Sequence, residues 1–67
     1  MDLVEKARVR LNHWLAHNES HQEEYAKLAA QLEEAGKRAS ALQLREMVEL
    51  SKRSDERLRK ALAALEP

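Results

Sequence analysis

Hydrophobic residues recur at alternating intervals of three and four in two long segments of the chain. The first segment's repeat runs through Val4, Ala7, Leu11, Trp14, Asn18, His21, Tyr25, Leu28, Leu32 and Ala35. The second segment's repeat runs through Ala41, Leu44, Val48, Ser51, Asp55, Leu58, Leu62 and Leu65. This spacing is typical of helices that pack side by side at a shallow angle. It predicts an all-α, two-helix antiparallel hairpin, with helices at about residues 3–35 and 39–66.

Local signals mark the ends of these two helices. Asp2, three residues before Glu5, has the pattern of an N-terminal capping box. Gly36 can adopt the left-handed conformation that often ends a helix, and Pro67 follows the last periodic leucine. Weak helix formers at residues 18–20 could interrupt the first helix. We expect it to continue, because the hydrophobic repeat passes through them without a shift.

Composition supports the helical class and excludes several others. The 67 residues include no Ile, Thr, Phe or Cys, and strong helix formers dominate. The length allows one domain, residues 1–67, and no apolar run approaches the ~18–20 residues of a membrane span. No signal-peptide pattern is present, so we expect a cytoplasmic protein without membrane association. Lys plus Arg and Asp plus Glu each number 12, and this balance argues against a nucleic-acid partner.

The two predicted helices alone can bury too little apolar surface to form a large core. A helix of ~33 residues is about 50 Å long, and each apolar stripe would have a single neighbour. Chains of this size rarely gain more than ~3–5 kcal/mol from their own core. We therefore expect two hairpins to form a homodimeric four-helix bundle. The alternative is a helical segment of a different protein that fills the groove.

Three histidines form the most distinctive feature of the sequence. His13, His17 and His21 are four residues apart, which places them on successive turns of one helix face, and Glu24 projects into the same sector. Imidazoles at this spacing can share one divalent transition-metal ion, such as Zn, Ni, Co, Cu or Fe.

Polar residues also interrupt the predicted seam between the helices. Asn18 and His21 interrupt the first helix, and Ser51 and Asp55 interrupt the second. An antiparallel register about the turn predicts that His21 faces Asp55. A polar layer lowers stability unless its groups pair with one another, so its presence requires an explanation.

Three interpretations of these polar residues remain open. In the first, His17 and His21 bind a metal ion with Glu24 or Asp55 as the carboxylate and His13 as an extra ligand. In the second, a hydrogen-bonded layer fixes register and partner choice without metal. In the third, the histidines lie on a solvated flank. The first predicts a small metal-binding or metal-sensing protein, and the second a scaffold or interaction module.

Catalysis receives little support from the sequence. His17 and His21 have the spacing of the two histidines in a zinc-protease helix, but Asn18 stands where the general-base glutamate would be. The chain has no phosphate-binding loop or nucleophile elbow, and a hairpin offers little concavity. We expect no enzyme; a minimal redox or hydrolytic metalloenzyme ranks third among the functions.

The segment from His13 to Tyr25 reads His-Trp-x-x-His-Asn-x-x-His-x-x-Glu-aromatic. It resembles the opening helix of a family of short prokaryotic helical-hairpin domains of unknown function. The Gln31–Gly36 segment and the Leu- and Ala-rich second half are similar in character to that family. The resemblance implies a helical hairpin in which the three histidines and Glu24 act together, and it implies no activity.

Overall fold

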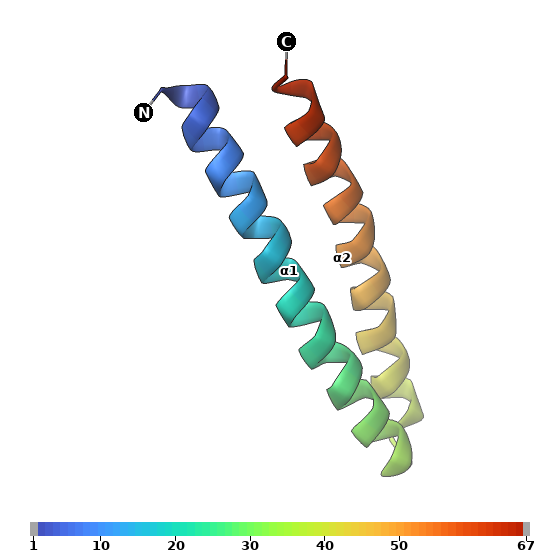
Figure 1. The fold of residues 1–67 in the computed structure, drawn as a ribbon. Coiled ribbons are helices and arrows are strands. Elements are labelled where there is room, and N and C mark those ends of the chain that lie inside the picture. Colours follow the sequence, from blue (N-terminus) through green and yellow to red (C-terminus); the bar gives the residue numbers. More distant parts are fainter. Residues whose placement is uncertain (1, 67) are drawn as a thin grey trace.

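The protein is an antiparallel helical hairpin. A computed structural model describes residues 2–66 and contains α1 (Leu3–Glu34) and α2 (Arg38–Ala64), with no strand in that range. The two helices lie side by side with both chain ends at the same end of a rod (Figure 1). The rod measures 50 × 17 × 10 Å. The predicted all-α hairpin is confirmed, and the stop signal expected from Pro67 lies outside the described residues.

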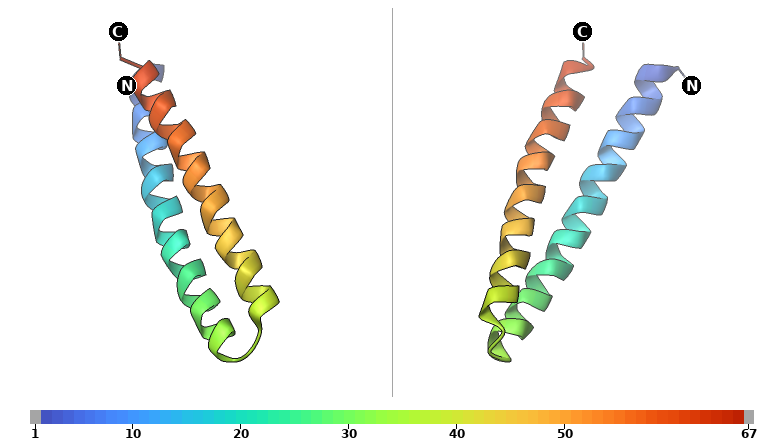
Figure 2. Two further views of the ribbon diagram at one scale, coloured as in Figure 1. Left: turned by 90° about the vertical axis from the view of Figure 1, so that its right-hand side faces the viewer. Right: turned by 180° about the vertical axis from the view of Figure 1, so that it is seen from behind.

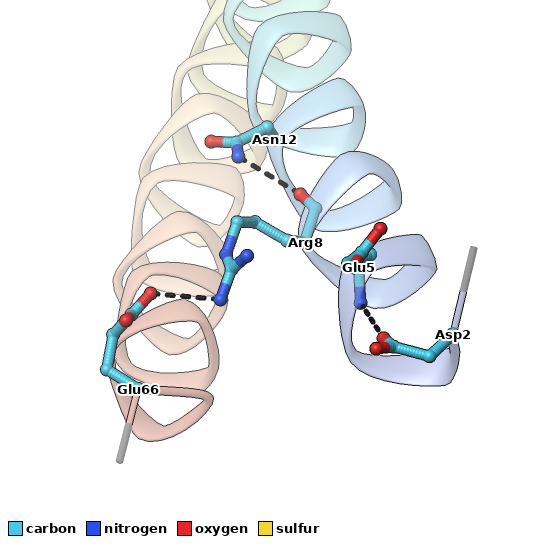
Figure 3. Close-up of polar contacts among 5 residues, drawn as sticks. All are labelled: Asp2, Glu5, Arg8, Asn12 and Glu66. Atoms are coloured by element: carbon cyan, nitrogen blue, oxygen red, sulfur yellow. Dashed lines mark hydrogen bonds and ion pairs between the residues drawn. The ribbon is translucent and has the colours of Figure 1, made fainter.

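Caps and a tight turn define the helix ends. The Asp2 carboxylate accepts a hydrogen bond of 2.8 Å from the Glu5 backbone N–H, as expected for an N-cap (Figure 3). Gly36 has φ 81°, and the backbone N–H groups of Gly36 and Lys37 donate to Glu33 and Leu32. This pair of bonds is a Schellman motif, which requires a left-handed residue that glycine adopts without a Cβ clash.

The observed bounds differ slightly from the predicted ones. α1 runs without interruption through residues 18–20, so its predicted continuity is confirmed. α2 begins at Arg38 because the Lys37 carbonyl, directly after the Schellman turn, already accepts the N–H of Ala41. It ends at Ala64. The next two backbone N–H groups donate to carbonyls three residues back instead of four.

The packing between the helices is closest near the turn. Ala29 and Ala41 are fully buried, and their small side chains let the two backbones approach. The leucines of the repeat nearer the termini are only half-buried. There the helices separate, as Figure 1 and the rear view of Figure 2 show. Ion pairs join the helices at both ends of the rod, Arg45 with Glu33 and Arg8 with Glu66. Both are exposed, and such pairs contribute little to stability.

A large part of the apolar surface remains uncovered in the single hairpin. Leu3 is 80% exposed, and Trp14 and Leu28 are each 47% exposed. Other large apolar side chains with substantial exposure are Val4, Val9, Leu42, Met47 and Leu50. No large hydrophobic side chain of residues 2–66 is fully buried. Neither helix is long and apolar enough to cross a membrane.

Candidate metal centre and polar layer

The three histidines form a ladder of rings along α1. The ring centroids of His13 and His17 lie 5.9 Å apart, and those of His17 and His21 lie 4.4 Å apart. The ladder continues to Tyr25, whose ring stacks on His21 at 5.8 Å. The predicted placement of these side chains on successive turns of one helix is therefore observed.

His17 and His21 converge through their outer ring nitrogens. The Nε2 atoms of the two rings are 2.9 Å apart, within hydrogen-bond distance. On the opposite edge of His21, Nδ1 lies 3.6 Å from Oε2 of Glu24. The tautomer of His21 with its proton on Nδ1 directs that proton toward this carboxylate and the Nε2 lone pair toward His17.

The contact between the two Nε2 atoms is a hydrogen bond, in which the N–H of one ring donates to the ring nitrogen of the other. A metal ion that displaced this proton could be reached by both nitrogens. Metal–imidazole bonds are about 2.0–2.1 Å long. Bonds of that length to two nitrogens 2.9 Å apart make an angle of about 90° at the metal. We call His17 and His21 the imidazole pair.

The remaining predicted ligands are less closely arranged around this point. Glu24 faces Nδ1 of His21, on the edge of the ring away from His17. The ring of His13 lies one turn before His17, toward the N-terminus of α1. Within residues 2–66, no three His, Asp or Glu side chains are grouped so as to hold a metal ion. A single hairpin therefore presents two converging ligands in this structure.

Asp55 belongs to a different cluster, buried between the helices. Its Oδ1 accepts a hydrogen bond of 2.9 Å from Asn18 Nδ2, and its Oδ2 accepts one of 2.8 Å from Gln22 Nε2. Gln22 Nε2 also donates to Ser51 Oγ at 2.8 Å. Asp55 is 4% exposed and Gln22 is 9% exposed. We call Asn18, Gln22, Ser51 and Asp55 the polar layer.

The predicted partner of Asp55 was wrong. The antiparallel register predicted that it faces His21, but the neighbouring Gln22 donates to it instead. Successive residues of a helix differ by 100° around the axis, so Gln22 faces α2 while His21 lies on the flank. One signal pointed to Gln22: residues 18 and 22 are four apart on α1, as residues 51 and 55 are on α2. Such pairs can face each other across a helix interface.

The polar layer is internally satisfied. No buried side-chain nitrogen or oxygen in the part of the chain that the structure describes lacks a hydrogen-bond partner. Both oxygens of the Asp55 carboxylate already accept amide N–H groups, whereas the contact within the imidazole pair is exposed. The site predicted as one cluster is thus two: an imidazole pair on α1 and a polar layer between α1 and α2.

Comparison with known families identifies the chain's relatives at the family level. The family profile for a domain of unknown function, DUF8180, matches residues 7–65. The chain belongs to this family. Comparisons with curated proteins and with solved structures give no match.

The DUF8180 match contains every residue of both clusters. It begins before His13 and ends after Asp55, so the imidazole pair and the polar layer both lie within the domain. The family description supplies no chemistry for either cluster. The geometry of these side chains therefore determines which chemistry this DUF8180 domain can perform.

Proposed function

We propose that this protein is a small metal-binding or metal-sensing protein in which His17 and His21 hold one divalent transition-metal ion. The observation that carries the proposal is the 2.9 Å separation of the two Nε2 atoms on neighbouring turns of α1. Helical residues four apart hold their side chains on one face. The pair is therefore largely preorganised and needs no change in the backbone to bind an ion.

Glu24 faces the ring nitrogen of His21 that does not point toward His17. Its carboxylate lies 3.6 Å from Nδ1 of His21. Carboxylates in this position fix the orientation of metal-bound histidines and increase their basicity. We assign Glu24 this orienting role and His13, whose ring centroid lies 5.9 Å from that of His17, the role of an outer ligand. Asp55 is not part of the proposed site, because its oxygens are occupied by amides.

The angle at the metal favours some ions over others. An angle of about 90° suits tetragonal or octahedral geometry, which Cu(II) and Ni(II) prefer. A tetrahedral ion such as Zn needs the two nitrogens about 3.3 Å apart, so the rings would have to open slightly. We therefore expect Ni or Cu to bind more tightly than Zn, with Co and Fe as further candidates. The His-Trp-x-x-His-Asn-x-x-His-x-x-Glu-aromatic pattern, which resembles that of prokaryotic hairpin domains, is on this proposal a metal-binding signature.

Metal titration of the tag-free, metal-stripped protein tests the proposal. Isothermal titration calorimetry with Ni, Cu, Co and Zn is expected to show stoichiometric binding accompanied by proton release. Thermal unfolding followed by circular dichroism is expected to shift to higher temperature, because metal binds the folded state.

Matched variants connect that binding to the imidazole pair. The His17→Ala, His21→Ala double variant is expected to lose binding, whereas His13→Ala retains most of it. All three residues are on the surface of α1, so the variants keep the helical spectrum. Metal binding by the double variant at the affinity of the parent protein would disprove the proposal.

A second candidate function is a metal-free interaction or scaffold module. The observation that favours it is the polar layer, whose hydrogen bonds pair specific positions of α1 and α2. Buried polar pairs of this kind can fix register and partner choice in helical assemblies. Under this function, replacing Asn18 and Asp55 together by leucine stabilises the fold but yields several oligomeric species on a sizing column. A single unchanged species would count against it.

A further inference from the structure

The imidazole pair provides only part of a coordination sphere. Transition-metal sites in proteins take four or more ligands. The chain has three histidines, all on α1, and only two of them converge. Asp55 is occupied within the polar layer. Apart from His13 as an outer ligand, the hairpin offers no further histidine, so additional imidazole ligands would have to come from another chain, with water as the alternative.

The surroundings of the imidazole pair indicate where those ligands come from. At 100° per residue, Leu3, Trp14, His17, His21 and Leu28 fall within about 60° of one another around α1. Trp14 and Leu28 are half-exposed and Leu3 more so, on either side of the pair along the helix. We call this stripe the histidine face. Its N-terminal half is a shallow, largely apolar groove lined by Leu3, Lys6, Ala7, Arg10, Leu11 and Trp14.

The opposite side of the hairpin has a different character. A groove there is lined mainly by charged side chains from both helices, Glu19, Gln22, Lys52, Asp55, Glu56 and Arg59. Charged surface of mixed sign is well solvated and does not require a covering partner. The surface that would gain from being covered is therefore the histidine face.

We propose that a second copy of this chain covers the histidine face and contributes its own His17 and His21, so that one metal ion is held by four imidazoles between two hairpins. This inference rests on the proposed metal-binding function. A two-fold axis that passes beside the imidazole pair brings two identical pairs together, and two-fold dimers are the commonest assemblies. Two pairs that each make about a right angle supply the four nitrogens of a square plane.

The exposed apolar side chains favour a second copy as the partner, and the net charge does not oppose it. The chain has zero net charge, so two copies do not repel each other through their net charges. The apolar side chains that flank the imidazole pair would be covered in the same step, which adds a hydrophobic contribution to dimerisation. The dimer is therefore expected to be stabilised by the metal and by these apolar contacts together.

Sedimentation velocity and native mass spectrometry during a Ni or Cu titration test this assembly. The expected result is one metal ion per two chains and a dimer whose dissociation constant falls on metal addition and rises again with EDTA. One metal ion per chain, whether in monomers or in dimers, overturns the shared site but leaves the proposed function standing. No metal binding at all overturns both.

A charge placed on the histidine face separates assembly from the imidazoles themselves. Trp14→Glu keeps both histidines but is expected to abolish the metal-linked dimer and lower the metal affinity, because only two imidazoles remain. Val9→Glu is the matched control, since Val9 is also exposed but lies on the back of α1. Circular dichroism verifies that both variants remain helical. Parent-like dimerisation of Trp14→Glu with metal would overturn the proposal.

Discussion

Replacing Gln22 by leucine tests whether the hydrogen bonds of the polar layer stabilise the hairpin. Gln22 is 9% exposed and donates to Oδ2 of Asp55 and to Oγ of Ser51. Leucine has a similar size but no donor, so Asp55 keeps only its bond from Asn18. The carboxylate is 4% exposed, which limits the access of water to the oxygen that loses its partner.

The magnitude follows from the bond to the carboxylate. A hydrogen bond to a charged group contributes about 1.5–3 kcal/mol to stability. Removing only its donor leaves the buried carboxylate oxygen unpaired, so the whole contribution is lost. We therefore expect Gln22→Leu to lower the free energy of unfolding by about 1.5–3 kcal/mol. For a domain of this size, each 1 kcal/mol shifts the melting temperature by about 4–8 °C.

Urea unfolding followed by circular dichroism at several protein concentrations measures this loss and reveals any contribution from self-association. The matched variant replaces Asn18, Gln22 and Asp55 together by leucine. Because it removes the buried charge along with its partners, its stability should equal or exceed that of the parent. A Gln22→Leu protein as stable as the parent would refute this account of the layer, as would a triple variant less stable than Gln22→Leu.

Three further predictions concern the turn, the close helix contact and an exposed ion pair. Gly36→Ala should lower stability by about 1 kcal/mol in thermal unfolding, because φ 81° is strained for alanine although nothing lies within 4 Å of the added Cβ. Ala41→Leu should cost about 1–3 kcal/mol and separate the helices near the turn, as measured by urea unfolding, because Ala41 is fully buried. The hydrogen bond from Arg45 and its charge lower the pKa of Glu33. The stabilisation from Glu33 is therefore present above its unfolded-state pKa and lost as the pH falls through its folded-state pKa. Glu33→Gln should make the fall in melting temperature with acidification shallower than in the parent, and an identical pH profile would contradict this.

The hairpin could be predicted from the sequence because its signals are local. A continuous three-and-four spacing determines two helices, and a glycine after the first one determines where the chain reverses. The start of α2 was placed about one residue late, because the Schellman turn leads directly into helix at Arg38. Such boundary details depend on backbone bonds that the hydrophobic pattern does not record.

The candidate site could be predicted only in part. The positions of His17, His21 and Glu24 relative to one another follow from helix geometry alone, and the structure brings them together. The partner of Asp55 depends on how α1 is rotated against α2. A heptad pattern leaves that rotation uncertain by about one residue, or 100°. That uncertainty explains why Gln22 was missed and His21 was placed opposite Asp55.

The two clusters alternate along the same two turns of α1. His17 precedes Asn18 and His21 precedes Gln22, so each imidazole of the pair adjoins an amide that is bonded to Asp55. The two amide–carboxylate bonds oppose rotation of α1 about its axis. With these bonds in place, the imidazoles lie on the flank, where a second copy or a metal ion can reach them. The polar layer thus fixes how α1 is rotated against α2, and this rotation directs the imidazole pair away from the interface. On the proposed metal-binding function, this division of roles accounts for a buried carboxylate at this level of a hairpin with so small a core.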